Sequence, residues 1–202
     1  MFLKSPHELI LASTSKYRRE LLTRLGIAFH CEPPHTDETP EPGERALGLV
    51  TRLARLKARA VAERHPQAFV IGSDQLAVRV DQADGEKILG KPLNRANCIE
   101  QLKGCSGQTL SFLTAVAVYR HEGEVLHEFV DTTRVMFRPL GAEVIERYVD
   151  REQPFDCAGG FKSEGLGITL FESITSIDPS ALIGLPLIKL AATLRLLGFQ
   201  LP

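Results

Sequence analysis

The sequence predicts an α/β protein with a mixed β-sheet and flanking helices. Two observations lead to this fold class: strand-like and helix-like stretches alternate along the chain, and some neighbouring strands are joined directly as hairpins. The chain has 202 residues, of which 44% are hydrophobic and 24% are charged. These values are ordinary for a globular protein with one core, so we expect a single domain over residues 1–202.

The first strand and helix lie in the stretch LILASTSKYRRELL, residues 9–22. Leu9 to Ala12 suit a buried strand, Ser15 suits a helix N-cap, and Gly26 falls where a left-handed helix end is expected. Arg18 and its cationic neighbours oppose the positive end of the helix dipole in this first turn. Because a bound anion would remove that conflict, the stretch is either a phosphate-binding cradle or an ordinary capped helix.

A polar, proline-rich loop over residues 31–44 leads into an amphipathic helix over residues 45–65. Lys57 falls on the apolar face of this helix, where a lysine must either extend to solvent or meet an anion. The other residues of that face are Leu47, Val50, Leu53, Ala54, Ala58 and Val61.

The rest of the chain alternates in the same way. Residues 68–74, AFVIGSD, indicate a buried strand with a polar tip, and residues 75–89 indicate a hairpin that turns at Asp84 and Gly85. Two long strands are predicted within residues 109–139 and a short helix over residues 142–150. Further predicted helix ends are a cap at Asn94, a stop at Gly104, a start at Pro186 and a stop at Gly198.

The net charge, the N-terminus and the cysteine spacing argue against nucleic-acid binding, membrane association, secretion and a zinc site. The formal net charge of −1 gives no overall attraction to nucleic acid or to a membrane. The N-terminus lacks an apolar run of signal-peptide length, and Lys189 and Arg195 interrupt the most apolar later segment, so we expect a cytoplasmic protein. Four cysteines and six histidines show no C-x-x-C or H-x-x-x-H spacing, which favours reduced structural thiols over a zinc site.

Several polar residues stand where α/β proteins bind ligands. Asp74, at the expected strand tip, suits a general base or a metal ligand, although an aspartate that caps a turn fits as well. Glu38 and its acidic neighbour could join Asp74 in holding a divalent cation. Lys91, in the rigid GKP loop, could reach a phosphate, and Glu164 could either serve a ligand or pair with Lys162. Together with the hydroxyls and cations of the first helix, these carboxylates and lysines suit the binding of a magnesium-bound polyphosphate.

The motifs of the chain, taken in order, closely resemble those of the Maf nucleotide pyrophosphatases. The resemblance rests on LASTSKYRRELL, TDETP, VTRLARLKA, GSDQ, LGKPLN, FKSEGLGITLFE and IGLPL, and it spans nearly the whole chain. It implies a fold with two lobes around a cleft, related to the inosine-triphosphate pyrophosphatases. It also implies hydrolysis of a nucleoside triphosphate to the monophosphate and pyrophosphate with a divalent metal, Mg²⁺ or Mn²⁺. It leaves the oligomeric state open, with a homodimer as one option.

The resemblance also implies roles for individual residues. Asp74 would be the base that activates water, and Glu38 would stand near the metal and the substrate. The residues that would bind phosphate are Ser13, Ser15, Arg18, Lys57 and Lys91.

Substrate choice is implied by the same motifs. STSxxRR, SDQ and FKSEG resemble the branch that acts on 7-methyl-GTP, with Tyr17, Gln75 and Glu164 at the positions that set base choice. The sister branch, which acts on dTTP and UTP, typically has glutamine in place of Glu164. A nucleotide-binding regulator of cell division is the non-enzymatic alternative. One departure from the family pattern is Lys16, which stands where proline is usual.

Overall fold

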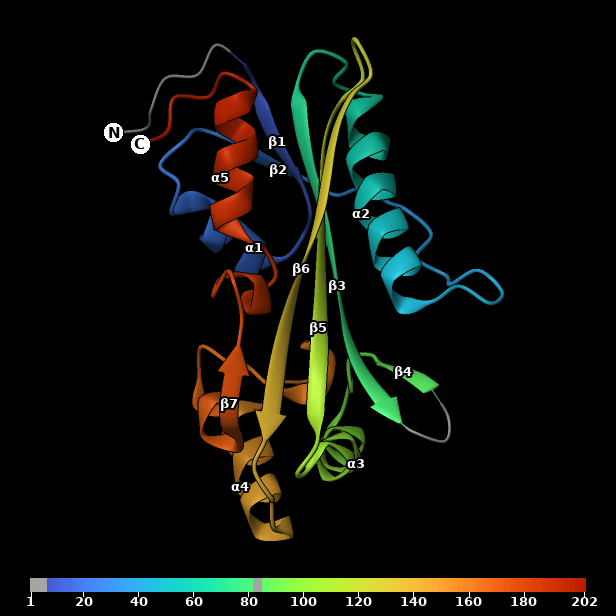
Figure 1. The fold of residues 1–202 in the computed structure, drawn as a ribbon, viewed down its shortest axis with the longest axis vertical. Helices are drawn as coiled ribbons and strands as arrows, with labels where there is room; N and C mark the ends of the chain where they lie inside the picture. Colours follow the sequence, from blue (N-terminus) through green and yellow to red (C-terminus); the bar gives the residue numbers. More distant parts are fainter. Residues whose placement is uncertain (1–6, 82–84) are drawn as a thin grey trace. The chain divides into compact units, whose positions relative to one another are not determined.

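The computed structural model describes residues 7–81 and 85–202, which contain a seven-stranded mixed sheet. The strand order is β2-β1-β3-β5-β6-β7. The seventh strand, β4, pairs with β3 and is not part of this linear order. Helices flank the sheet (Figure 1), so the predicted fold class is confirmed. The chain separates into two compact units: unit 1 is residues 1–74, 114–131 and 178–202, and unit 2 is residues 75–113 and 132–177. The single domain and the cleft stay predictions.

Unit 1 contains the parallel part of the sheet. β1 (Leu9–Ala12) lies between β2 (His30–Glu32) and β3 (Phe69–Asp81). Ile10 pairs with His30 on one side and with Val70 on the other. All of β1 is buried, as expected for a parallel strand that is covered on both faces. The two long strands β5 (Thr109–Arg120) and β6 (Val125–Phe137) each have one part in this unit.

Helices cover both faces of the sheet in unit 1 (Figure 1). α1 (Lys16–Thr23) and α5 (Leu187–Leu196) share a hydrophobic core with one face, to which Leu9 and Leu11 contribute. Because side chains alternate along a strand, Ile10 faces the opposite side, which α2 (Ala46–Ala62) covers.

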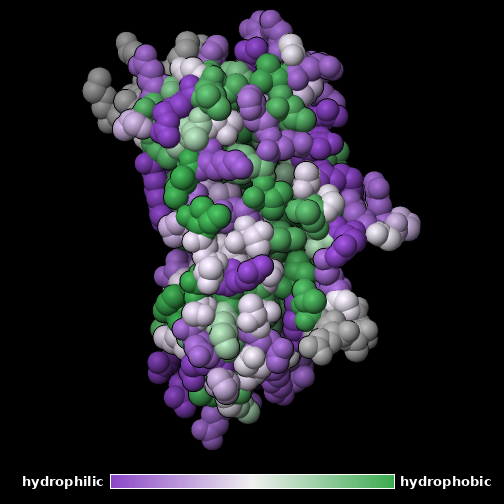
Figure 2. All heavy atoms as spheres, in the orientation of Figure 1, coloured by the Kyte–Doolittle hydropathy of each residue, from purple (hydrophilic) through white to green (hydrophobic). Residues whose placement is uncertain are grey.

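α2 is the amphipathic helix that the sequence predicts, with one correction to its apolar face. Leu47 is 56% exposed, and Leu49 is buried in its place. The reason is that Leu49 lies four residues before Leu53 and so shares its side of the helix. The outer side carries arginines in ion pairs with glutamates, and Figure 2 shows mainly hydrophilic residues over this helix.

Unit 2 contains antiparallel pairs. β4 (Gly85–Leu89) pairs with β3, which confirms the predicted hairpin, although Asp84 at its turn lies outside the described residues. β7 (Phe171–Thr175) pairs with β6. The unit also contains α3 (Arg95–Cys105), α4 (Ala142–Glu152) and the 3₁₀ turns Ala158–Gly160 and Leu166–Leu170.

An aromatic cluster forms part of the core of unit 2. The ring of Phe161 meets those of Phe112, Phe137 and Phe171 edge to face, with centroids 4.8–5.5 Å apart. Edge-to-face contacts of this kind add to the stability that burial of the rings supplies. Since Phe161 begins the FKSEG motif, the cluster anchors that loop to the sheet.

Most predicted helix ends are confirmed. Oδ1 of Asn94 accepts a hydrogen bond from the backbone N–H of Asn97 at 2.9 Å, so Asn94 caps α3. α5 begins directly after Pro186, and Gly198, just beyond its end, has a φ of 89°. That left-handed conformation favours glycine over other residues.

The cysteines are free thiols. Burial raises the pKa of Cys98 to about 11 and that of Cys105 to about 12, so both stay protonated at neutral pH and act as small core residues. Within the part of the chain that the structure describes, no helix combines the length and apolarity needed to cross a membrane.

Candidate active site

Asp74 lies within a strand, which corrects the prediction that it occupies a strand tip. β1 pairs with β3 from Phe69 to Ile71, and β3 then continues to Asp81. It continues because residues 77–81 pair with β4, so its backbone groups keep their partners after β1 has ended. Asp74 therefore stands just beyond the parallel pairing, in the middle of a longer strand.

Gly72 allows α2 to approach β3 closely. A Cβ atom at this position would clash with the carbonyl oxygen of Ala54 and lie 2.6 Å from the backbone nitrogen of Ala58, so only glycine fits. Because side chains alternate along a strand, Asp74 points to the same face as Gly72, toward α2. Lys57 lies beside Ala54 and Ala58 on the helix, and this close approach brings it to Asp74.

Lys57 forms ion pairs with two carboxylates. Its Nζ lies 2.7 Å from Oδ1 of Asp74 and 2.9 Å from Oε1 of Glu38. The side chains of Lys57 and Asp74 are 7% and 10% exposed, whereas that of Glu38 is 55% exposed. Of the two alternatives for this lysine, the structure therefore supports contact with an anion. Glu38 occupies the solvent side of the group.

Asp37, the acidic neighbour of Glu38, has a different role. Its Oδ1 accepts hydrogen bonds from the hydroxyl of Thr39 at 2.6 Å and from the backbone N–H of Thr39 at 2.9 Å. These bonds lower the pKa of the Asp37 carboxyl below its usual value. Asp37 thus shapes the turn of the proline-rich loop, while Glu38 is the acid that reaches Lys57.

Ser13, Ser15 and Arg18 lie together where β1 leads into α1. Oγ of Ser13 accepts a hydrogen bond from the backbone N–H of Ser15 at 3.1 Å, and Oγ of Ser15 accepts one from that of Arg18 at 3.4 Å. The second bond confirms Ser15 as the N-cap. Nε of Arg18 donates to the carbonyl oxygen of Gly184 at 3.0 Å. This bond orients the guanidinium, whose Nη groups are the donors that suit a phosphate.

Arg18 interacts electrostatically with the acidic group on α2 and β3. Burial lowers the pKa of its guanidinium, and the carboxylates of Asp74 and Glu38 oppose that shift. Arginine remains charged at neutral pH in either case. Arg18, Lys57, Glu38 and Asp74 therefore form one group with two positive and two negative charges.

Sequence reasoning missed the residues that position Arg18. The hydroxyl of the buried Ser73 donates to the same carbonyl oxygen of Gly184 at 3.2 Å. The loop that carries Gly184 begins with the buried Asp178 and Ser180, whose side chains are hydrogen-bonded at 2.5 Å. The sequence did contain a signal for this loop, the tripeptide DPS at residues 178–180, because such residues typically precede a helix.

Tyr17 lies half-buried on α1 beside Lys16. Nζ of Lys16 lies 4.9 Å from the centroid of the Tyr17 ring, which is a cation–π contact. Lys16, where the family usually has proline, therefore places a cation on the aromatic ring that is predicted to meet the base.

Lys91, Gln75 and Glu164 lie in unit 2. Lys91 is exposed in the loop between β4 and α3, and Gln75 is half-buried on β3 directly after Asp74. Glu164 is exposed, and its Oε2 accepts a hydrogen bond from the hydroxyl of Ser163 at 3.3 Å. The structure thus gathers the other predicted site residues in unit 1 and places these three in unit 2.

Glu152 of α4 holds the loop that carries Glu164. Nζ of Lys162 lies 3.6 Å from Oε1 of Glu152, so Lys162 pairs with this residue and not with Glu164. The other carboxylate oxygen of Glu152 accepts from the backbone N–H of Leu166 at 2.8 Å. A Cβ atom on Gly165 would lie 2.7 Å from the same oxygen, so a larger residue there would push the Glu152 carboxylate away from its position at Leu166. The loop is therefore fixed on both sides of Glu164.

The carboxylates of Asp74 and Glu38 fit a hard divalent cation. Lys57 contacts one oxygen of each, which leaves Oε2 of Glu38 for a cation and Oδ2 of Asp74 either for that cation or for the water that Asp74 would deprotonate. Mg²⁺ and Mn²⁺ prefer oxygen ligands, and Mg²⁺ usually takes one or two carboxylates together with substrate phosphates.

Comparison with known proteins identifies the family. A family model described as Maf-like protein matches residues 8–197. The chain belongs to the Maf family. This Maf protein is 50% identical over 195 residues to the 7-methyl-GTP pyrophosphatase of Vibrio parahaemolyticus, with 96% of this chain and 98% of the relative covered. It is 54% identical over 194 residues to the 7-methyl-GTP pyrophosphatase of Xanthomonas oryzae pv. oryzae, with the same shares covered.

A solved structure supports the fold of this Maf protein. The Ham1 protein of Staphylococcus aureus matches with a TM-score of 0.51 and 16% identity, covering 93% of this chain and 98% of that one. Identity this low establishes a shared fold alone. The roles of the site residues and the homodimer stay predictions.

Proposed function

We propose that this Maf protein hydrolyses 7-methyl-GTP to 7-methyl-GMP and pyrophosphate. The family assignment and the names of its full-length relatives support a nucleotide pyrophosphatase of this specificity. The observation that carries the proposal is the Glu38–Lys57–Asp74 group beside Arg18, because it combines a fixed carboxylate with cations suited to a triphosphate. Four free cysteines also suit a cytoplasmic location.

In this proposal Asp74 removes a proton from the water that attacks the α-phosphorus. A bond forms between the water oxygen and phosphorus, the bond from phosphorus to the bridging oxygen breaks, and pyrophosphate leaves with the bonding electron pair. Lys57 holds the Asp74 carboxylate in position throughout. A Mg²⁺ or Mn²⁺ ion at Asp74 and Glu38 would supply charge neutralisation to the phosphates.

Phosphate binding is assigned to cations and hydroxyls near the start of α1, to Lys57, and to one loop lysine. Arg18, oriented by Gly184, suits a bidentate contact with phosphate oxygens, and Ser13 and Ser15 lie beside it. Lys91 is exposed, which suits a point charge that neutralises the triphosphate. The helix N-terminus adds a favourable dipole for an anion.

Base recognition is assigned to Tyr17, Gln75 and Glu164. Methylation at N7 gives guanine a positive charge, which suits an aromatic ring and a carboxylate. Nζ of Lys16 lies 4.9 Å from the centroid of the Tyr17 ring, so a cationic base would have to displace this ammonium or stack on the other face of the ring.

The test is a screen of the purified protein against 7-methyl-GTP, GTP, dTTP and UTP with added Mg²⁺ or Mn²⁺. We expect the highest kcat/KM with 7-methyl-GTP, with the monophosphate and pyrophosphate as first products. A higher kcat/KM with dTTP or UTP would instead indicate the pyrophosphatase activity of the sister branch. Nucleotide binding without turnover would favour the regulator, and a diphosphate as first product would contradict attack at the α-phosphorus.

A further inference from the structure

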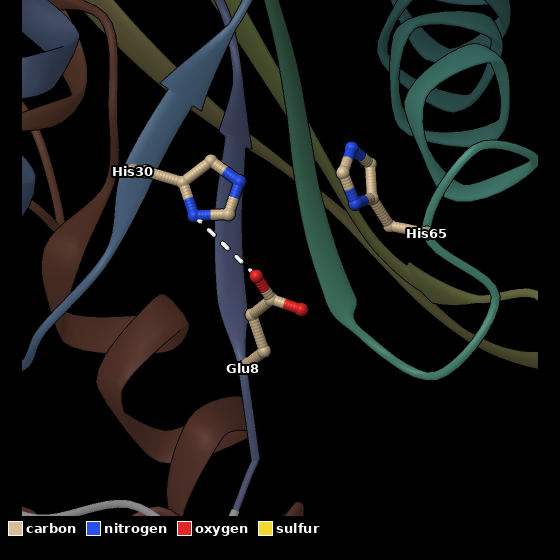
Figure 3. A group of neighbouring side chains, drawn as sticks. All are labelled: Glu8, His30 and His65. Carbon is tan, nitrogen blue, oxygen red and sulfur yellow. Dashed lines mark ion pairs between the residues drawn. The ribbon is translucent and has the colours of Figure 1, made fainter.

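A second group of potential metal ligands lies at the amino-terminal ends of the parallel strands in unit 1, whereas the candidate active site lies beyond the carboxyl end of β1. Glu8 directly precedes β1, His30 begins β2, and His65 lies in the turn that leads from α2 into β3 (Figure 3). One ligand atom from each residue lies within 4.8 Å of the other two. Ser13 follows the carboxyl end of β1, whereas Glu8 precedes its amino end, so this group is separate from the candidate active site.

We propose that Glu8, His30 and His65 bind a transition-metal ion of the Zn²⁺ class. Two imidazoles and one carboxylate, with water in a fourth position, are a ligand set that zinc adopts in proteins. Imidazole nitrogens favour Zn²⁺, Ni²⁺ and Cu²⁺, whereas oxygen-only ligands such as Glu38 and Asp74 favour Mg²⁺ and Mn²⁺. The two sites therefore select different metals.

Glu32 orients the ring of His65 for this role. Oε2 of Glu32 lies 2.6 Å from Nε2 of His65, and Oε1 lies 2.6 Å from Nε of Arg64. A carboxylate at Nε2 holds the ring proton there and leaves Nδ1 as the metal-binding nitrogen. His30 likewise presents Nδ1, which lies 3.7 Å from Oε1 of Glu8. In the proposed site the ligand atoms are Nδ1 of His30, Nδ1 of His65 and Oε1 of Glu8.

The backbone beneath these ligands is fixed, so only side chains need to move. The carbonyl oxygen of Glu8 accepts from the backbone N–H of Phe69 at 3.0 Å, and His30 is paired with Ile10 in the sheet. The backbone of His65 is hydrogen-bonded on both sides within its turn. Ligand atoms around a tetrahedral zinc ion are roughly 3.3 Å apart, as follows from metal–nitrogen distances of about 2.0 Å. Small side-chain rotations close the difference from the observed spacing.

The test is a titration of the full, tag-free chain with Co²⁺, a spectroscopic substitute for Zn²⁺. We expect one equivalent to produce visible d–d absorption that Zn²⁺ then removes by displacement. His30→Ala and His65→Ala should lose this signal, whereas His121→Ala, an exposed histidine in another turn, should keep it. Zn²⁺ should also raise the melting temperature of the wild type but not that of His30→Ala.

Two further variants separate this site from its surroundings. Glu32→Gln should weaken Co²⁺ binding by roughly 10–100-fold, because it removes the group that orients His65 without removing a ligand. Glu38→Gln should leave the Co²⁺ spectrum unchanged. Circular dichroism of the metal-free variants checks their folding. Glu8→Gln changes the third proposed ligand and is titrated with Co²⁺ in the same way. The proposal fails if the wild type shows no such absorption, or if the signal survives in His30→Ala and His65→Ala.

Discussion

Nζ of Lys57 lies 2.7 Å from Oδ1 of Asp74 at a position where both side chains are almost wholly enclosed. Charges removed from water are tolerated only when they remain paired. Each partner therefore restrains the other, since Asp74 cannot turn away from α2 without leaving Lys57 buried against the carboxylate of Glu38 alone. This restraint fixes the orientation of Asp74, as the proposed role of general base would require.

Asp74→Asn should lower kcat by roughly 10²–10⁴-fold, because the amide cannot accept a proton from the attacking water. The change keeps the shape of the side chain, so circular dichroism should match that of the wild type. Steady-state kinetics with 7-methyl-GTP measure the effect. Asp150→Asn is the matched control, since Asp150 is 54% exposed in an ion pair with Arg95. A kcat near that of the wild type in Asp74→Asn would remove this residue from the catalytic role.

Lys57→Met should destabilise the protein by roughly 3 kcal/mol, because it leaves the Asp74 carboxylate buried without its cation. Urea unfolding measures the loss. The double variant Lys57→Met/Asp74→Asn should recover part of it, since no unpaired charge then remains in the interior. Lys103→Met is the control, because Lys103 forms an exposed pair with Glu100 that should contribute less than about 1 kcal/mol. Equal losses in Lys57→Met and Lys103→Met would show that the buried pair is not needed for stability.

Glu44 should make stability depend on acid pH. Hydrogen bonds from Arg52 lower the pKa of the Glu44 carboxyl to about 2. Because the folded pKa is below that of the unfolded chain, about 4.3 for a free glutamate, the contribution of Glu44 is complete above pH ~5 and is lost as the pH falls toward 2. The difference in melting temperature between the wild type and Glu44→Gln should therefore shrink over this range. A difference that stays constant from pH 6 to pH 3 would contradict the assignment.

The sequence predicted the helices and the central strands, because hydrophobic periodicity and capping residues are local signals. It missed β2 (His30–Glu32), which overlaps the start of the predicted loop, and β7 (Phe171–Thr175), because short outer strands carry little periodicity of their own. Ser15, Asn94 and Pro186 mark helix starts that the structure confirms. The end of β3 was predicted wrongly at Asp74, because the strand continues by pairing with β4, and pairing is not a local property. Leu47 was placed on the buried face for a similar reason: its exposure depends on what α2 packs against.

The candidate site was only partly predictable. The position of Lys57 on an apolar face predicts that it needs an anionic partner, but the sequence does not identify Asp74 and Glu38 as that partner. Gly184 belongs to the IGLPL motif, yet its role as a carbonyl acceptor for Arg18 and Ser73 depends on the fold. His30 and His65 lie too far apart in the chain to show metal-ligand spacing, and pairing of β1 with both neighbouring strands brings them together.

Glu164→Gln should narrow the preference for 7-methyl-GTP over GTP more than it weakens phosphate binding. The carboxylate can make a charge-assisted hydrogen bond to the guanine edge and attract the positive charge that N7 methylation creates, an interaction worth about 1.5–3 kcal/mol. Glutamine keeps the size of the side chain and loses the charge, so kcat/KM for 7-methyl-GTP should fall by about tenfold or more while that for GTP changes less. Glu172→Gln, another exposed glutamate in unit 2, is the matched control. Equal discrimination in the wild type and Glu164→Gln would show that this carboxylate does not recognise the base.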